Sequence, residues 1–412
     1  MAEAVAPALE RAEVVVARLG ELFEIDRAAG TNRPGLGSGE QRAHDMVAGW
    51  MREAGLEVEA DRGGNLFGRL RGSAPDLPEV WSGSHLDTPP DGGAFDGALG
   101  VLTALETAAV ISASGGARRT IAVVAFRLEE GPRFGRGVFG SRAVVGQLEP
   151  DEGDLRDPDG ITLAEAFAAL GFGELPSAGW VDPPPACFVE AHIEQGPALA
   201  ALGAPLGIVT SIAGMAGLEL VFSGRRGHAG TVPMHLRADA VAAAAAFVTA
   251  LHDAARSVPG GVATVGSVEV SPGASNTIPG RAALFADIRA PEAAGLERLV
   301  AEVDGCARAA AAATGCTAEV VPRWRYEPEP MDTAVRDTLR RAVSSIGLDP
   351  VDIASGAGHD AAILAAAGIP TGMLFVRSDA GGVSHAPEEH TGTDAVAACL
   401  AALEPALREL AA

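Results

Sequence analysis

The sequence has few cysteines, and none of the patterns that give cysteine a structural or metal-binding role. Four occur in the 412 residues, and no two of them form a CxxC pair: Cys187, Cys306, Cys316 and Cys399. This spacing favours neither a thiolate zinc site nor a disulfide framework. We expect four reduced, partly buried thiols.

The sequence also lacks a secretory signal and a long apolar segment. Its first 27 residues carry Glu3, Glu10, Arg11 and Glu13 among apolar residues. They predict an amphipathic helix rather than a basic start followed by an apolar run. The longest largely apolar run, Ala240 to Leu251, is too short to span a bilayer. We therefore expect a cytoplasmic protein with no membrane contact.

Basic charge is scarce as well. The chain has 31 Lys and Arg residues against 54 Asp and Glu residues, which gives a formal net charge of −23. Such an acidic chain repels phosphate backbones, and this argues against a nucleic acid partner. Apolar residues make up 48% and charged residues 21%, as in ordinary globular proteins, and the length predicts two or three domains.

Helical and strand patterns alternate up to about residue 207 and again after about residue 327, which predicts an α/β domain built on a sheet. Between residues 212 and 326 a βαββα-like block predicts a separate inserted domain with an open antiparallel sheet. Helices are predicted over residues 46–54, 97–111, 238–255, 292–313, 334–346 and 361–367, and strands over 80–84, 120–126, 188–191, 218–222, 262–270, 282–288 and 372–376.

The first candidate site residues follow the predicted strand at residues 80–84. His85 in GSHLDT offers an imidazole nitrogen to a metal, and Asp87 can accept the other ring N–H and fix the tautomer. Asp96 lies between glycines in GGAFDGALG, just before a predicted helix. Helix capping would explain this aspartate, and so would a carboxylate that bridges two cations.

Two adjacent acidic residues, Glu129 and Glu130, end the apolar strand TIAVVAFRL. They repel each other unless cations or protons intervene. Adjacent strand residues point to opposite sides, so one carboxylate can bind metal while the other handles protons. Two solvated loop acids are the alternative interpretation.

Two further histidines complete the candidate cluster: His192 in EAHIEQG and His385 in SHAPEE, again after apolar strands. Mixed imidazole and carboxylate ligands suit Zn²⁺, Mn²⁺, Co²⁺ or Ni²⁺. His359 begins a predicted helix, and we expect a structural role for it. No role is predicted for the histidines in helical stretches or polar loops, which are His44, His252, His235 and His390.

The motifs together resemble a known family. GSHLDT, GGAFDGALGV, EEGPRFG, GSR, HIEQG, GHAGTVPM, SNTIPG, DIR, GAGHDA and SHAPEE occur in this order between Arg33 and Glu389. They are similar to the hydantoinase/carbamoylase branch of the M20 metallopeptidase-like amidohydrolases. Pro132 and Val232 stand where these motifs more often have Ser and Thr.

The resemblance implies a function for each motif residue. Asp96 would bridge two divalent cations, one completed by His85 and His192 and the other by Glu130 and His385. Glu129 would be the general base, and His228 would stabilise the oxyanion. The residues expected to hold the substrate are Gln195, His228, Asn276 and Arg289. The peptidase branches have a carboxylate where this chain has His192, which points away from peptidases.

The resemblance also implies an overall design. A catalytic domain with a central mixed sheet, residues 1–211 and 327–412, would be interrupted by a lid and dimerisation domain, residues 212–326. The expected reaction is hydrolysis of an N-carbamoyl-L-amino acid by a homodimer. Allantoate amidohydrolase and β-ureidopropionase are the alternatives. An aminoacylase or dipeptidase, or a metal-free binding protein, fits the residues less well.

Overall fold

The computed structural model describes residues 2–27, 32–181 and 183–412, and it divides into two compact units. Unit 1 contains the chain up to Thr210 together with Met331–Ile353 and His359–Ala412, and unit 2 contains Ser211–Pro330 and Ala354–Gly358. Among the described residues, no helix is both long enough and apolar enough to cross a membrane.

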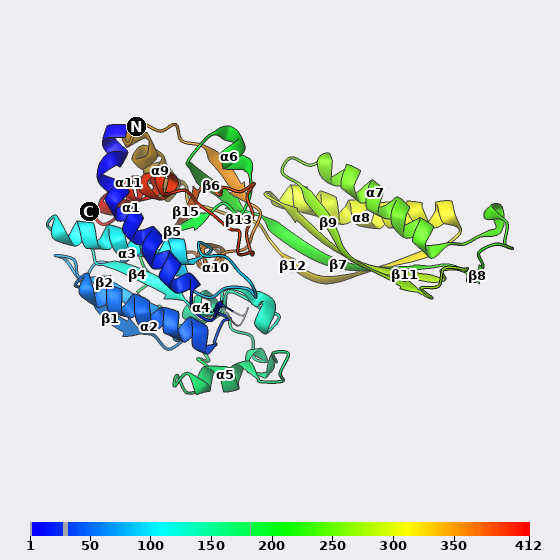
Figure 1. The fold of residues 1–412 in the computed structure, drawn as a ribbon, viewed down its shortest axis with the longest axis horizontal. Helices are drawn as coiled ribbons and strands as arrows, with labels where there is room; N and C mark the ends of the chain where they lie inside the picture. The colour runs from blue at the N-terminus through cyan, green and yellow to red at the C-terminus, as the bar shows by residue number, and fades with distance from the viewer. Residues whose placement is uncertain (1, 28–31, 182) are drawn as a thin grey trace. The chain divides into compact units, whose positions relative to one another are not determined.

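The large sheet has nine strands, in the order β1-β2-β4-β3-β5-β15-β6-β13, with β14 paired to β6 (Figure 1). Strands β3, β4, β5 and β15 are parallel to their neighbours within this group, whereas the outer pairs are antiparallel. The strands are β1 (Glu57–Ala60), β2 (Leu66–Leu70), β3 (Val80–His85), β4 (Ile121–Phe126), β5 (Cys187–Ile193), β6 (Leu206–Ile212), β13 (Glu329–Pro330), β14 (Asp352–Ser355) and β15 (Thr371–Val376). The predicted mixed sheet is confirmed.

Helices cover the parallel strands, which are buried along their whole length. α1 (Ala2–Phe23), α3 (Ala98–Ala113), α9 (Thr333–Ser345) and α11 (Thr393–Leu410) pack beside one another (Figure 1). α2 (Ser38–Glu53) lies along β1 and β2, and α10 (Asp360–Ala366) contacts α4 (Phe139–Val145), β5 and β15. The shorter helices are α5 (Leu163–Ala169), α6 (Ala198–Leu202) and the 3-10 helices η2 (Gly131–Arg133), η3 (Glu152–Asp154) and η4 (Met234–Leu236).

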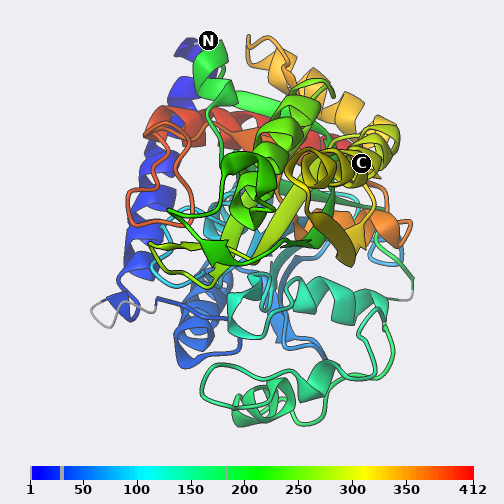
Figure 2. The same ribbon diagram turned by 90° about the vertical axis from the view of Figure 1, so that its right-hand side faces the viewer.

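Unit 2 is an antiparallel sheet in the order β12-β7-β11-β9, with two long helices on one face (Figure 2). Its elements are β7 (Gly214–Ser223), β8 (Gly227–His228), α7 (Ala240–Arg256), β9 (Val262–Ser271), β10 (Thr277–Ile278), β11 (Arg281–Ala290), α8 (Ala293–Thr314) and β12 (Thr317–Tyr326). Leu220 and Phe222 of the sheet and Phe247 of α7 are fully buried in its core. Among the strands that the structure describes, the small strands β8 and β10 form a separate two-stranded sheet.

Several elements differ from the sequence-based prediction, which included no strand corresponding to β1, β2, β6 or β14 and no helix corresponding to α11. α2 begins at Ser38 rather than at residue 46, because its first turns are polar and carry no apolar periodicity. The apolar run TIAVVAFRL continues to Leu128, but β4 ends at Phe126 as predicted, because Leu128 has a left-handed φ of 47° that no strand accommodates. β12 was not predicted: it is an edge strand, and an edge strand tolerates Pro322 beside an irregularity in its pairing.

Candidate metal centre

The candidate residues of unit 1 lie at the carboxyl ends of parallel strands. His85 is the last residue of β3, and His192 is the next-to-last residue of β5. Glu129 and Glu130 follow β4, and the segment with His385 follows β15. These strands are neighbours in the sheet, so residues from distant parts of the sequence meet at one edge.

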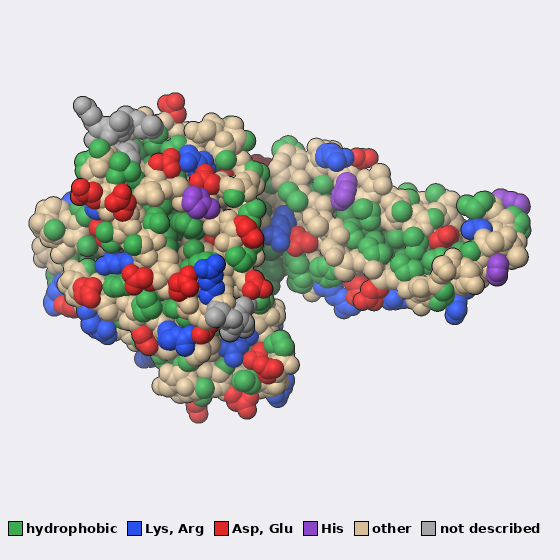
Figure 3. Space-filling model, in the orientation of Figure 1, with side chains coloured by type: hydrophobic (Ala, Val, Ile, Leu, Met, Phe, Trp, Pro, Cys, Tyr) green, Lys and Arg blue, Asp and Glu red, His purple; other side chains and the backbone are tan. Residues whose placement is uncertain are grey.

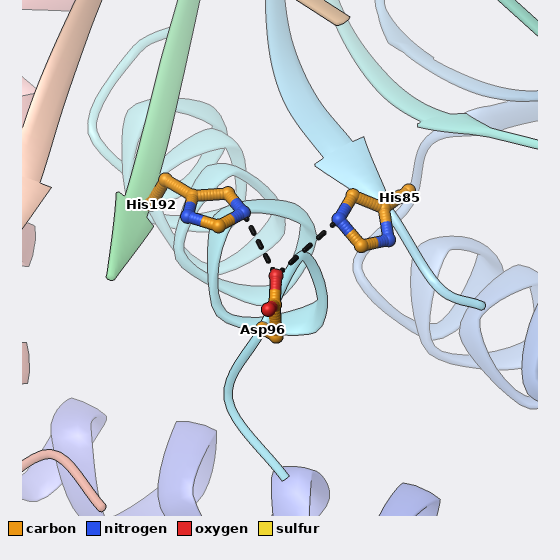
Figure 4. Close-up of side chains that lie close together, drawn as sticks. All are labelled: His85, Asp96 and His192. Carbon is orange, nitrogen blue, oxygen red and sulfur yellow. Dashed lines mark ion pairs between the residues drawn. The ribbon is translucent and has the colours of Figure 1, made fainter. Parts of the chain in front are cut away.

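Asp96 lies at the centre of this cluster and is buried, immediately before α3 (Figure 4). Its Oδ1 is 3.1 Å from Nε2 of His192 and 3.5 Å from Nε2 of His85. Its Oδ2 is 3.3 Å from Nε2 of His385, and that nitrogen is also 3.3 Å from Oε1 of Glu130. The two carboxylate oxygens of Asp96 therefore face two different groups of donors.

Each group has the donor set of a divalent cation site: His85, Asp96 and His192 in one, and Asp96, Glu130 and His385 in the other. Ligand atoms bound tetrahedrally at about 2.0–2.1 Å from a zinc ion lie roughly 3.3 Å apart, close to the separations seen here. The second ring nitrogens are occupied, since Nδ1 of His85 is 3.1 Å from the Asp87 carbonyl oxygen and Nδ1 of His192 is 2.9 Å from that of Ile193. Nδ1 is thus engaged with the main chain in both rings, and Nε2 is the nitrogen that would coordinate a metal after losing the proton it shares with Asp96.

Gln195 points into the same cluster. Its Nε2 donates to Oδ2 of Asp96 at 2.7 Å. Its Oε1 is buried and has no hydrogen-bond partner among the residues that the structure describes. An orphaned oxygen beside a group of metal-ligand atoms fits a centre that binds a further group, and we expected Gln195 near the substrate.

Asp87 orders the residues on both sides of it. Its Oδ1 accepts the backbone N–H of Glu129, and its Oδ2 accepts that of Glu130, both at 3.0 Å. The same Oδ1 is 3.4 Å from Nδ1 of His85. The main-chain oxygen of Asp87 is closer to that nitrogen, at 3.1 Å. The predicted contact between Asp87 and His85 exists, but the carboxylate mainly holds the segment with the two acidic residues.

The charges of the cluster depend strongly on one another. Burial acts to raise the pKa of Asp96, but hydrogen bonds from His192, His385 and His85 hold that pKa well below its usual value. Burial raises the pKa of Glu129 well above its usual value. Positive His85 lowers this pKa, and negative Glu130 raises it. Hydrogen bonds to Asp96 and then Glu130 raise the pKa of His385 to about 10. Asp96 is therefore an anion, as a bridging ligand requires.

Two residues near Asp96 were not predicted to have a role, although both belong to the motif SHAPEE. Glu389 accepts the backbone N–H groups of Phe95 at 2.7 Å and Asp96 at 2.9 Å. The Ser384 hydroxyl is 3.1 Å from Oδ2 of Asp96 and 3.0 Å from Oε2 of Glu389, and it can donate its proton to either carboxylate. The sequence analysis assigned a role only to His385 in this motif. The polar residues Ser384 and Glu389 in the same motif could have been recognised as candidates.

The buried residues behind His192 were also missed. The ring of His359 lies 4.5 Å from that of His192, and burial followed by the positive charge of His192 lowers its pKa well below the usual value. Glu190 accepts hydrogen bonds from the Ser84 hydroxyl and the backbone N–H of Ala361. Glu190, His192 and His359 form a further group with metal-ligand atoms, so His359 lies beside the centre.

The remaining predicted residues lie in unit 2 and occupy two separate places. His228 on β8 pairs with Thr277 of β10, and Asn276 accepts the backbone N–H of Ala229 at 2.9 Å. His228 and Asn276 are both exposed. Arg289 lies near the far end of β11, where it forms an ion pair with Asp287 at 2.8 Å and donates to the Gly356 carbonyl. His228 and Asn276 are thus neighbours, and Arg289 is apart from them.

Comparison with known proteins identifies the chain. The sequence model of peptidase family M20/M25/M40 matches residues 81–409, which is most of the chain and includes every candidate residue of the metal centre. The chain belongs to this family. The resemblance seen in the motifs is therefore confirmed, and so is the classification as a hydrolase acting on carbon–nitrogen bonds.

Relatives of this M20 protein have two kinds of name. An N-carbamoyl-L-amino acid amidohydrolase from Geobacillus stearothermophilus is 40% identical over 90% of this chain and 92% of its own length. A probable allantoate deiminase from Oryza sativa subsp. japonica is 37% identical over 92% of this chain and 85% of its own length. A hydantoinase/carbamoylase family amidase from Burkholderia multivorans has a similar structure, with a TM-score of 0.91, 33% identity and coverage of 97% and 98%.

Proposed function

We propose that this M20 protein hydrolyses the carbamoyl group of an N-carbamoyl-L-amino acid to give the L-amino acid, CO₂ and ammonia. The observation that carries the proposal is the position of Asp96, whose two oxygens each face a separate group of imidazole and carboxylate donors. The names of several relatives favour this substrate class. Two divalent cations bound there would polarise the substrate carbonyl and lower the pKa of water.

The protein side chains would supply binding and proton transfer. Glu129 is nearly buried, with Oε2 3.8 Å from Nε2 of His85. It belongs to neither donor group around Asp96, although its carboxylate also lies within ligand distance of atoms of His85 and Glu130. A carboxylate at this position would take a proton from water and return it to the leaving nitrogen. Arg289 would bind the substrate carboxylate through its planar fork in place of Asp287. Asn276 lies beside His228 and would help to hold the substrate from the same chain that contributes His228.

Allantoate is the second candidate substrate, because plant relatives named allantoate deiminase are 32–37% identical over most of the chain. Allantoate carries the same ureido group and a carboxylate, so the metal centre does not distinguish the two reactions. β-Ureidopropionate remains a third candidate from the sequence.

We further propose that the protein is a homodimer in which His228 acts on the partner's metal centre. His228 pairs with residue 277, before β11 begins, whereas Arg289 lies eight residues beyond the start of that strand. At about 3.4 Å per residue, the two side chains are roughly 25 Å apart within unit 2. A single ureido acid is too short to contact both in one chain, which supports a His228 contributed by the partner.

The surface of unit 2 is compatible with a dimer. β9 is an edge strand, and Val262 and Val268 on it are 54% and 53% exposed. Figure 3 shows hydrophobic side chains gathered over α7 and β9. An open edge with exposed apolar side chains invites pairing with another chain. The inserted unit is thus our proposed dimerisation domain.

The metal proposal predicts how metal content depends on individual ligands. Elemental analysis of the active enzyme should find roughly two divalent ions per chain. Asp96→Asn should lose both, because each donor group uses one oxygen of Asp96, whereas His385→Ala should keep the ion held by His85 and His192. Chelation should abolish activity, and Zn²⁺ or Mn²⁺ should restore it. A fully active preparation with one ion per chain would contradict the proposal.

A substrate panel tests the reaction. N-carbamoyl-L-amino acids, their D enantiomers, allantoate, β-ureidopropionate, N-acetylamino acids and dipeptides should be compared by release of ammonia or amine. We expect kcat/KM for an N-carbamoyl-L-amino acid to exceed that for the N-acetyl and peptide substrates by at least about tenfold. Allantoate as the best substrate would select the second candidate, and a dipeptide as the best substrate would refute both.

A further inference from the structure

The two acidic residues of the metal centre lie on a segment with an unusual backbone. Successive N–H groups of an extended strand point to opposite sides, yet the N–H groups of Glu129 and Glu130 both reach Asp87. The chain turns just before them, at Leu128, whose φ is 47°. This left-handed conformation is rare for a large residue, and Leu128 is fully buried. The conformation therefore has to be held by contacts from elsewhere in unit 1.

Glu40 of α2 supplies the central contact. Its Oε1 accepts the backbone N–H of Leu128 at 2.9 Å, and its Oε2 accepts that of Leu36 at 2.8 Å. The same Oε2 pairs with Nη1 of Arg127 at 3.1 Å. Glu40 is fully buried, and one carboxylate thus ties together α2, the loop before it and the segment that leads to Glu129.

Arg127 completes the restraint and is also buried. Its Nε donates to the Gly64 carbonyl at 2.8 Å, its Nη2 donates to Gln41 at 2.8 Å, and its backbone N–H donates to Asn65 at 3.0 Å. Burying a charged pair costs desolvation free energy, so such a pair is weak evidence for added stability. The pair of Glu40 and Arg127 instead fixes the position of the backbone immediately before Glu129, because both side chains hydrogen-bond to or belong to that segment.

We propose that Glu40 is a positioning residue that sets where Glu129 and Glu130 stand in the metal centre. It contacts neither the donor atoms nor the expected substrate position, and it acts through Leu128 and Arg127. The inference rests on the proposed function for its effect on catalysis. Displacing a reacting group by about 1 Å can cost roughly 10²-fold in rate.

The test is Glu40→Gln, with Glu79→Gln as the matched control. Glu79 also pairs with an arginine, Arg69, at 2.7 Å in unit 1, but it has no hydrogen bond to residues 127–130. We expect Glu40→Gln to lower kcat by about 10–10²-fold while KM changes less than about threefold. The absorption spectrum of the Co²⁺-substituted protein should change because Glu130 moves. The control should match the wild type in all three measurements.

Hydrogen–deuterium exchange of the metal-free protein measures the restraint without substrate or metal. In Glu40→Gln the peptide containing residues 127–130 should exchange faster, while the core strands β3 and β5 keep wild-type rates. Unchanged exchange there, or wild-type kcat in a folded variant, would overturn the proposal. If the wild type hydrolyses no ureido acid, the proposed function fails, and the exchange result alone decides the role of Glu40.

A second variant covers the case in which Glu40→Gln does not fold. The double variant Glu40→Gln/Arg127→Met leaves no unpaired charge in the core, so the fold should survive. The same faster local exchange and lower kcat are expected, because glutamine has one acceptor oxygen and cannot accept the backbone N–H groups of Leu36 and Leu128 together. A folded double variant with wild-type exchange and kcat would refute a positioning role.

Discussion

Replacing Glu129 by glutamine should leave the metal content unchanged and lower kcat by about 10²–10⁴-fold. Glutamine is nearly the same size and keeps one oxygen, but it cannot accept the proton from water. The backbone N–H of Glu129 still donates to Asp87 after the change, so the segment should stay in place. Single-turnover and steady-state rates with an N-carbamoyl-L-amino acid, together with elemental analysis, measure both effects.

The adjacent residue provides the matched control. Glu130→Gln is the same substitution one position later, but Oε1 of Glu130 is 3.3 Å from Nε2 of His385 in the second donor group. This variant should lose one ion as well as activity. If Glu129→Gln lost metal like Glu130→Gln, Glu129 would be a ligand. If Glu129→Gln kept near wild-type kcat, it would not be the base.

The sequence predicted the parts of this molecule that are encoded locally. The apolar run before residue 127 predicted a buried central strand, and His85 and His192 were placed at strand ends, where β3 and β5 bring them together. Ligands of open sheets collect at such ends. A metal-binding role could be proposed for His85 and His192 because histidines and acidic residues follow several of the predicted apolar strands.

The contacts that orient these residues could not be predicted in the same way. Glu40 lies in a polar stretch with no apolar periodicity, yet it is fully buried and bonded to residues about 90 positions away. The left-handed backbone of Leu128 has no local signal, since leucine rarely adopts it. Glu389 meets Asp96 only through the tertiary fold. Such polar contacts between distant segments depend on the packed structure rather than on a repeating pattern.

Mixing two inactive variants should restore activity if His228 acts on the partner's metal centre. In a dimer of His228→Ala chains both sites lack His228, and in a dimer of Glu129→Gln chains both sites lack the base. In a mixed dimer, the His228→Ala chain keeps its own Glu129 and receives His228 from its partner. Random exchange of equal amounts makes half of the dimers mixed, with one intact site of two, so about one quarter of wild-type activity is expected.

The control separates true complementation from a simple mixing effect. Glu129→Gln mixed with Asp96→Asn should regain nothing, because Glu129 and Asp96 lie in the same metal centre of unit 1 and each chain's site stays defective. Subunit exchange has to be verified by mass spectrometry of differently tagged chains. If exchange is complete and the mixture of His228→Ala and Glu129→Gln stays inactive, His228 acts within its own chain or has no part in catalysis. A monomer in sedimentation experiments would exclude the shared site directly, because no partner would be present to contribute His228.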